Sequence, residues 1–316
     1  MASTFGVIPY KDRDEWLGLR MLGIGGSDVS AIMGYNAHKS PLTLWLEKTG
    51  RKEPEDLSDN ESVKWGVKHE PMLRDEFAAN HPELVVQVPG AIYRNAERSW
   101  EQASLDGEVY DKAAGEFAVL EIKTAGELMA KDWEDGVPVY YEAQVTHYLN
   151  VTGWRRAYVA VLIGGNKYRE YIVEPDDADR QAVRDAVAKF WGMVQSDTPP
   201  ALVGIKDEGE ALATYHGDST GNVRQVSAEA DGLIDRYVEL GESIKADEHE
   251  RQQVANKIKQ LIGDDKGITT DLYGVTWVRG MRRRLDTKRL AADHPEVVGD
   301  YYTEALTDGG LRVRGI

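Results

Sequence analysis

The chain contains no cysteine among its 316 residues. It therefore forms no disulfide and offers no thiolate to a zinc ion or an iron–sulfur cluster, and this agrees with a reducing compartment. No apolar run approaches the roughly 18 residues of a membrane-spanning helix, and residues 1–10 lack the basic start and apolar centre of a signal peptide. We therefore expect a cytoplasmic protein that does not contact a membrane.

Basic charge is also scarce. Lys and Arg number 38 against 54 Asp and Glu, so the formal net charge is −16 at pH 7. Nucleic-acid binding depends largely on neutralisation of phosphates by Lys and Arg, so this balance predicts weak non-specific binding to DNA. It does not exclude a nuclease, which needs only a local basic groove and whose carboxylates are offset by bound metal.

The length predicts one large domain and a smaller one. Hydrophobic periodicity and turn signals predict alternating helices and strands, which is typical of an α/β (α+β) domain with a small twisted mixed sheet flanked by helices. Pro71 should kink or break its helix. We expect helices over 12–22, from 27, from 41, over 62–79, 139–150 and 176–195, and strands over 84–88, 91–93, 100–109, 118–123, 157–163 and 168–173.

A boundary is expected after Thr198-Pro199-Pro200, where a polar, Gly-rich stretch begins. We assign residues 1–203 to the main domain, 204–225 to a linker and 226–316 to a mainly helical C-terminal extension. The extension should contain a long polar helix over 228–261, a strand over 273–279 and a basic cluster from Arg279 to Arg284. This cluster could contact phosphate or could equally be a solvated face.

Two carboxylates and an amine form the most informative pattern. Asp106 precedes Gly107, and Glu121 and Lys123 follow in the strand-like run 117–123. Residues two apart on a strand point to the same face, so Glu121 and Lys123 project together. Carboxylate oxygens are what Mg²⁺ or Mn²⁺ prefers. The pattern indicates a metal-dependent phosphodiesterase, although Glu-x-Lys alone could also be an exposed alternating face.

Three further side chains have the right chemistry to complete such a site. Glu70 lies on the upstream helix, and Gln144 and Tyr148 lie four residues apart on one face of a downstream helix. The Gln144 and Tyr148 side chains could hydrogen-bond the Lys123 ammonium or a phosphate. Taken alone, Glu70 is better explained as a solvated helix residue and Tyr148 as a core residue.

The order of these segments resembles the YqaJ-like viral recombinases, the phage lambda-type exonucleases of the PD-(D/E)xK nuclease superfamily. The resemblance runs from about Trp16 to Val203. It is carried by Trp16-x-x-x-Arg20 with Gly25-Gly26-Ser27-Asp28, Gly66-x-x-x-Glu70, Ser104-Leu105-Asp106-Gly107, Glu121-Ile122-Lys123 and Gln144-x-x-x-Tyr148.

The resemblance implies a restriction-endonuclease-like core and a site with Mg²⁺, for which Mn²⁺ can substitute, at two ions per site. Asp106 and Glu121 would be metal ligands together with the carbonyl of Ile122. Glu70 would bind or support the second ion. Lys123 would orient the attacking water and help to deprotonate it.

The resemblance also implies how DNA is held. Gln144 would position Lys123 or the nucleophile, and Tyr148 would face the substrate. Arg20 and Ser27 match positions that hold the 5′-terminal phosphate in the family. The guanidinium of Arg20 has the planar fork that suits a phosphate, and Ser27 opens a helix, where N–H groups favour anions.

The implied function is a 5′-3′ exonuclease that acts on double-stranded DNA ends in the bacterial host of a phage or prophage. It would leave 3′ overhangs for a single-strand annealing protein. Ring formation in the family implies a homotrimer. Two alternatives stay open: a restriction-like endonuclease, and a catalytically idle module that binds DNA ends. A cluster-bearing nuclease of the CRISPR-adaptation type is excluded, because the chain has no cysteine.

Overall fold

The computed structural model describes residues 5–281, 283–301 and 311–313. The chain divides into two compact units, residues 1–217 and residues 218–316.

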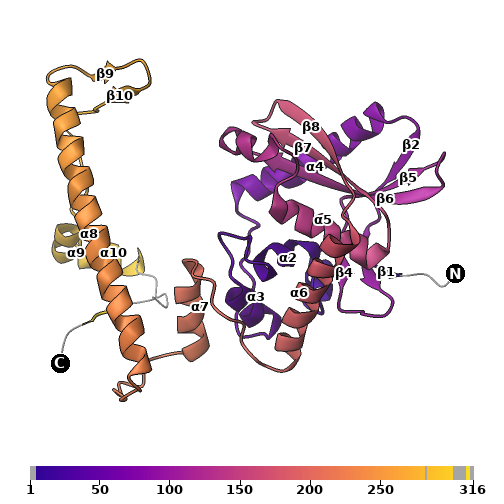
Figure 1. Ribbon diagram of the computed structural model, residues 1–316, viewed down its shortest axis with the longest axis horizontal. Coiled ribbons are helices and arrows are strands. Elements are labelled where there is room, and N and C mark those ends of the chain that lie inside the picture. Colours follow the sequence, from indigo (N-terminus) through magenta and orange to yellow (C-terminus); the bar gives the residue numbers. More distant parts are fainter. Residues whose placement is uncertain (1–4, 282, 302–310, 314–316) are drawn as a thin grey trace. The chain divides into compact units, whose positions relative to one another are not determined.

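A five-stranded mixed sheet is the centre of the first unit (Figure 1). The β6–β7 pair is parallel and the other three pairs are antiparallel. This sheet, with helices packed against it, confirms the predicted mixed α/β class. Its strands, in spatial order, are β2 (Leu84–Gln87), β5 (Gly107–Asp111), β6 (Glu116–Ala125), β7 (Ala157–Ile163) and β8 (Lys167–Val173).

Helices α4 (Glu61–Asn80) and α5 (Val139–Thr152) pack against the sheet. In β6, Leu120 and Ile122 share a core cluster with residues of α4, and Val119 shares another with residues of α5. Successive side chains on a strand alternate between faces, so the α5 side also receives Glu121 and Lys123. The alternation of β6 thus aims the two polar side chains at the helix that carries Gln144.

A second sheet and the remaining helices complete the unit. The three strands order as β1 (Phe5–Pro9), β3 (Ala91–Asn95) and β4 (Gln102–Ala103). A further core cluster joins residues of α2, α3, α5, α6 and α7. The other helices of this unit are α1 (Arg13–Arg20), α2 (Gly26–Ile32), α3 (Pro41–Lys48), η1 (Glu127–Trp133), α6 (Asp177–Gln195) and α7 (Asp207–His216).

Two expectations for the first unit were wrong. The strand predicted over 100–109 is split between β4 and β5, which belong to different sheets. The chain leaves the ladder between them because Ser104 accepts a hydrogen bond from the Trp16 indole, 3.1 Å, and Asp106 accepts one from the Ile122 N–H, 2.8 Å. Helix α4 also continues through Pro71, so the break that was predicted as one of two outcomes, a kink or a break, does not occur. Its turn beyond the proline is held by the buried side chains of Leu73 and Phe77.

The segment predicted as a linker, 204–225, contains helix α7, so the first unit extends to Gly217. The carboxylate of Asp207 explains the docking of α7 on α3, since it accepts hydrogen bonds from the Ser40 N–H, 2.8 Å, and the Thr43 hydroxyl, 2.7 Å. These partners are more than 160 residues away in the sequence, so no local pattern could predict them.

The second unit is built on one long helix, α8 (Glu229–Ile262), which confirms the helix predicted over 228–261. The strand predicted over 273–279 is shorter and pairs with one that was not predicted. Arg282 of the basic cluster lies outside the described residues. No described helix has the length and apolar character needed to cross a bilayer. The smaller elements are β9 (Gly267–Thr269), β10 (Gly274–Thr276), α9 (Thr287–Asp293), α10 (Pro295–Val298) and η2 (Gly299–Tyr301).

Candidate active site

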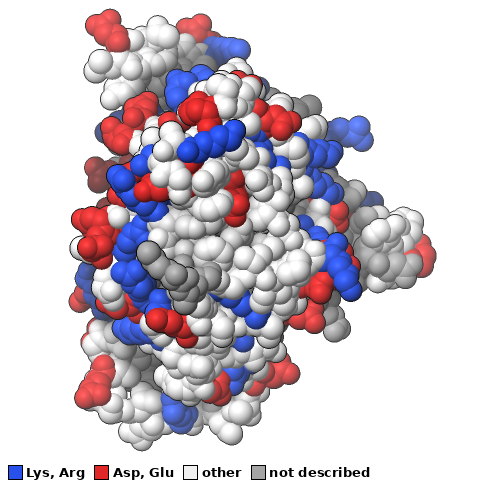
Figure 2. All heavy atoms as spheres, turned by 90° about the vertical axis from the view of Figure 1, so that its right-hand side faces the viewer, with Lys and Arg blue, Asp and Glu red and all other residues white. Residues whose placement is uncertain are grey.

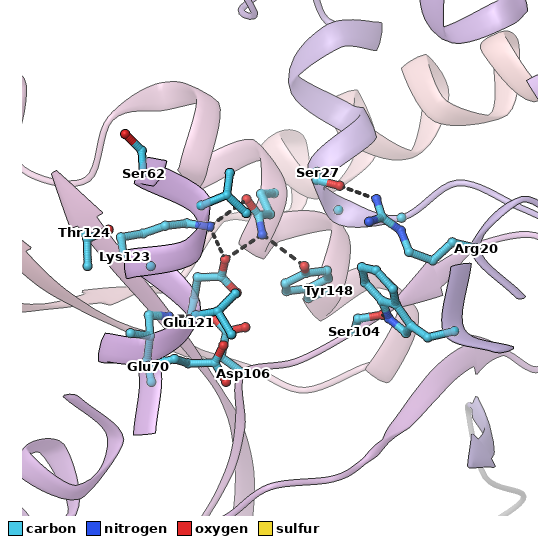
Figure 3. A pocket seen from close by; sticks show the side chains of 18 residues that line it. Arg20, Ser27, Ser62, Glu70, Ser104, Asp106, Glu121, Lys123, Thr124 and Tyr148 are labelled. Atoms are coloured by element: carbon cyan, nitrogen blue, oxygen red, sulfur yellow. Dashed lines mark hydrogen bonds and ion pairs between the residues drawn. The ribbon is translucent and has the colours of Figure 1, made fainter. Parts of the chain in front are cut away.

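A pocket of about 440 Å³ in the first unit collects all of the predicted site residues. In Figure 3 the carboxylates of Glu70, Asp106 and Glu121 lie at one end with Lys123, and Arg20 and Ser27 lie at the other. The ring of Tyr148 lies between the two ends. Gln144 and Ile122 also line the pocket.

The acidic end is organised by the pairing of β5 with β6. Asp106 directly precedes β5, and its Oδ2 accepts a hydrogen bond of 2.8 Å from the Ile122 N–H, beside Glu121. Gly107 permits this close pairing, because a Cβ there would lie 3.1 Å from the Leu120 side chain. One oxygen of Asp106 is therefore fixed by the main chain, which sets the direction of the other.

Glu121, Lys123, Gln144 and Tyr148 form one hydrogen-bonded chain. The Lys123 ammonium lies 2.5 Å from Glu121 Oε1 and donates to Gln144 Oε1 at 3.3 Å. The Gln144 amide nitrogen donates to Glu121 Oε1 at 2.5 Å and to the Tyr148 hydroxyl at 3.0 Å. The ammonium also lies 4.7 Å above the ring of Tyr141. Gln144 thus holds both the acid and the amine in place.

The charges at this end are out of balance. Burial and then the neighbouring Asp106 carboxylate raise the pKa of Glu121 to about 8, although Lys123 opposes them. Burial also raises the pKa of Asp106. Burial alone would lower the pKa of Lys123, but Glu121 and Asp106 outweigh it and raise that pKa. Lys123 is therefore an ammonium, but this one positive charge does not keep the pKa values of the two buried carboxyl groups in their usual range.

Glu70 brings a partner that the sequence patterns did not predict. Its carboxylate forms an ion pair with Arg74, whose Nε also donates 2.8 Å to the main-chain carbonyl of Asp106. Burial and the Asp106 charge raise the pKa of Glu70, and Arg74 opposes them. Arg74 follows Glu70 by four residues on α4, and this helical spacing was the available signal.

The opposite end is basic, and its side chains contact one another. Arg20 Nη2 donates to the Ser27 hydroxyl at 2.5 Å and lies 3.8 Å from an oxygen of Asp28. Its guanidinium covers the Trp16 ring at 4.7 Å. Asp28 is buried and is bound by Lys48 at 2.9 Å. Although burial would raise the pKa of Asp28, Lys48 and Arg20 lower it to about 2. Lys48, which comes from α3, was not predicted.

Gly26 connects the two ends, because it lets α2 approach α5 closely. A Cβ at Gly26 would lie 2.3 Å from Tyr148 Cε1 and 2.9 Å from Gln144 Cγ. The Gly25-Gly26 sequence therefore acts as a packing device. It places Ser27, at the start of α2, beside the helix that carries Gln144 and Tyr148.

The donor set at the acidic end suits a divalent cation. Glu121 Oε2 is buried without a hydrogen-bond partner among the described residues, and Asp106 lies close enough to shift its pKa. A bound cation would offset the free-energy cost of burying an unpartnered carboxylate oxygen and that of holding two carboxylates close together. No group of three or more His, Cys, Asp or Glu side chains in the described part of the chain stands at metal-binding distance. Two carboxylates would thus need a main-chain carbonyl, water or phosphate to complete the coordination.

Comparison with known proteins decides the family. The model of the YqaJ-like viral recombinase domain matches residues 15–155. "Uncharacterized protein YqaJ" of Bacillus subtilis (strain 168) is 35% identical over 290 residues, which cover 90% of this chain and 89% of that protein. The chain belongs to the YqaJ-like viral recombinase family. The YqaJ-like match in the first unit contains every predicted site residue from Arg20 to Tyr148.

Solved structures resemble the fold at lower sequence identity. The alkaline exonuclease LHK-Exo from Laribacter hongkongensis matches with a TM-score of 0.48 and 18% identity, over 58% of this YqaJ-like chain and 94% of that one. LHK-Exo in complex with dAMP gives the same TM-score at 19% identity. Likeness at this level decides nothing about activity.

Proposed function

We propose that the chain is a metal-dependent exonuclease that hydrolyses linear double-stranded DNA from its 5′ ends and leaves 3′ single strands. The observation that carries this proposal is one pocket with two different ends. Asp106, Glu121 and Lys123 converge at one end, and Arg20 and Ser27 lie at the other. Such a pocket suits a chain end whose terminal phosphate binds away from the bond that is cut.

The acidic end would hold the cation through Asp106, Glu121 and the carbonyl of Ile122, with Glu70 in support. Bound Mg²⁺ or Mn²⁺, at two ions per site, would stabilise the charge that develops on the scissile phosphate and assist the attacking and leaving oxygens. The ion pair with Arg74 engages one carboxylate oxygen of Glu70, and Glu70 would bind or support the second ion directly or through water.

Lys123 would orient the attacking water and stabilise the hydroxide that forms from it. Its raised pKa means that it acts as a fixed positive charge and not as a neutral base. Gln144 keeps this ammonium beside Glu121, so both protein groups approach the phosphate in one geometry.

The basic end would bind the 5′-terminal phosphate. Arg20 offers a planar set of N–H donors, and the Ser27 hydroxyl lies at the start of α2. The Tyr148 hydroxyl accepts from Gln144, so its own hydrogen can donate to a phosphate oxygen. By the same proposal, the overhang produced would be used by a single-strand annealing protein.

Digestion of end-labelled DNA tests the proposal. Linear duplexes labelled at either the 5′ or the 3′ end, together with closed circular DNA, are incubated with Mg²⁺. We expect release from 5′ ends alone, intact circles, and no product from Glu121→Gln. The matched control is Glu116→Gln, an exposed residue on the same strand, which should retain full activity.

Other outcomes would replace the proposal with a defined alternative. Cutting of closed circles by the wild type, lost in Glu121→Gln, would indicate a restriction-like endonuclease. Binding to DNA ends without any product in Mg²⁺ or Mn²⁺ would indicate a catalytically idle module.

A further inference from the structure

Helix α8 has no described partner along most of its length. It spans 34 residues, yet Ile262 is its only buried residue. A helix in water depends mainly on the burial of an apolar face for its stability, and one without such burial is marginal even when long. The exposed apolar residues of α8 therefore indicate a missing contact.

Those residues follow a heptad pattern. Apolar side chains recur at alternating spacings of three and four, which is the seam of a coiled coil. Six large apolar side chains of this seam are between 45% and 77% accessible. The ten seam positions are Ala230, Leu233, Tyr237, Leu240, Ile244, Asp247, Arg251, Val254, Ile258 and Leu261.

The hairpin of β9 and β10 covers a different stripe of the helix. Ile262 is buried there, and the Lys259 ammonium lies 5.7 Å from the ring of Trp277. Val254 and Leu261 remain exposed in the same part of α8. Of the seam residues in this part of α8 only Ile258 is partly buried, so most of the seam is open to another helix while the hairpin is docked.

Two charged residues interrupt the seam and determine which helix fits. Asp247 and Arg251 are exposed, and neither is in an ion pair within residues 5–281, 283–301 and 311–313. Two parallel copies would place Asp247 against Asp247 and Arg251 against Arg251. Two antiparallel copies, related by a two-fold axis at His249, would place each Asp247 against an Arg251 of the other copy.

The same axis brings the apolar positions together in order. Because the two helices run in opposite directions, the residue numbers of two facing residues add up to the same value in every layer. This gives three apolar layers beyond each charged one, Ile244 with Val254, Leu240 with Ile258, and Tyr237 with Leu261. Shifting the register by one heptad would set Asp247 against Ile244 and Arg251 against Leu240, which leaves both charges buried without a partner.

We propose that α8 is a dimerisation helix that binds α8 of a second copy of this chain in an antiparallel coiled coil. The interface is isologous, since each copy contributes the same seam. The two Asp247–Arg251 layers select this orientation and register over the others, and the apolar layers supply the affinity. Each dimer joins two nuclease units through their C-terminal extensions.

Charge exchange in the full-length protein tests the pairing. Asp247→Arg and Arg251→Asp each place like charges opposite one another, so light scattering should show a dimer Kd at least about 100-fold higher. The double variant Asp247→Arg/Arg251→Asp restores opposite charges and should dimerise like the wild type. Glu242→Arg, on the outer side of the heptad, is the matched control and should leave the dimer unchanged. Circular dichroism of each variant checks that α8 is still folded.

A monomeric wild type, single variants that dimerise normally, or a double variant that stays monomeric would each overturn the proposal. A trimer whose mass none of these changes alters would also overturn it.

Disulfide cross-linking tests the orientation of the two helices. Because the chain has no native cysteine, only the introduced thiols can react. Glu248 lies next to the two-fold axis, so the two thiols of Glu248→Cys meet only in an antiparallel pair. Those of Leu240→Cys meet only in a parallel pair. On oxidation we expect a covalent dimer from Glu248→Cys and none from Leu240→Cys. The reverse result would overturn the antiparallel arrangement.

Discussion

Lys123 is the residue whose removal best separates catalysis from binding. Its ammonium is held by Glu121 and Gln144 at the acidic end of the pocket, and its raised pKa keeps it charged. We expect Lys123→Ala to lower kcat on linear duplex by at least about 100-fold, with DNA binding nearly unchanged. Single-turnover digestion and end-binding titrations measure the two effects. Lys112→Ala, which changes an exposed lysine in the β5–β6 turn, is the control and should keep the wild-type kcat. A kcat near that of the wild type in Lys123→Ala would remove Lys123 from the mechanism.

Arg20 should act on the chain end and not on the bond that is cut. Its guanidinium lies with Ser27 at the far end of the pocket from Glu121. Arg20→Ala should therefore lower kcat/KM on 5′-phosphorylated duplex by about tenfold or more, and by much less on a 5′-hydroxyl duplex. The two substrates serve as each other's control. Equal losses on both would assign Arg20 to structure or to general DNA binding.

Asp28 should stabilise the first unit in a pH-dependent way. Its side chain is 10% exposed and that of its partner Lys48 is 4% exposed, so Asp28→Asn would leave a buried ammonium unpaired. We expect a loss of about 3 kcal/mol of unfolding free energy at pH 7. Because the pKa is about 2 when folded and 3.8 in the unfolded reference, this stabilisation is complete above about pH 4 and disappears as the pH falls through about 2.

Urea unfolding of both proteins between pH 7 and pH 3 checks the Asp28 prediction. The gap between wild type and Asp28→Asn should narrow only below about pH 4. Asp197→Asn is the control, since it breaks an exposed ion pair with Arg51 and should change stability much less. A gap that stays constant down to pH 3 would mean that the ionisation of Asp28 is not its source.

The contact between α2 and α5 depends on Gly26. A Cβ there would overlap the ring of Tyr148, which is buried and hydrogen-bonded to Gln144. Gly26→Ala should force α2 outward, with a loss of about 1 to 3 kcal/mol in stability and a fall in activity on phosphorylated ends. Thermal unfolding and end digestion measure both. Gly18→Ala on α1, where nothing lies within 4 Å, should be neutral or stabilising, and similar behaviour of the two variants would refute the packing argument.

Elements with a regular period could be predicted from the sequence, and those fixed by distant contacts could not. The apolar alternation of β6 is local, and it was sufficient to place Glu121 and Lys123 on one face. The end of β4 depends on Trp16, 88 residues from Ser104, so the split of the predicted strand had no local signal. Helix α7 depends in the same way on a carboxylate that binds α3.

In the candidate site, too, some residues could be predicted from the sequence and others could not. All of the predicted residues line one pocket, and Arg20 and Ser27 were predicted through the family resemblance alone. The supporting partners Arg74 and Lys48 were missed, since an arginine or a lysine on a helix is in most cases solvated and only the fold shows what it contacts. Prediction from sequence therefore reached residues that share one pocket but not the charged side chains that support them.

The family relationship extends past the nuclease unit. The first unit ends at Gly217, so a match that covers 90% of the chain must include part of the second unit. The described extension therefore belongs to the protein architecture that the Bacillus relative shares. Helix α8 and its seam lie in the part of the chain that the match covers. Pairing of two copies through α8 would therefore belong to the architecture that the two YqaJ-like proteins share, and not to a tail added to this chain.

The acidic balance of the chain should limit how it holds DNA. Its net charge is −16, and on the face shown in Figure 2 the Lys and Arg side chains alternate with Asp and Glu. Binding of duplex would then rest on a few cations in and beside the pocket, Arg20 above all. Each phosphate contact contributes about 0.9 to the slope of log K against log salt, so we expect a slope of magnitude roughly 2 to 4.

The inactive variant Lys123→Gln, titrated with duplex from low to high salt at constant Mg²⁺, measures that slope. Removing Arg20 from it should lower the slope by about 1, because one phosphate contact is lost. Removing an exposed cation far from the pocket, as in Arg155→Ala, should leave it unchanged. A slope of magnitude about 6 or more would require an extended basic track, and DNA would then be held by much of the surface and not by the pocket alone.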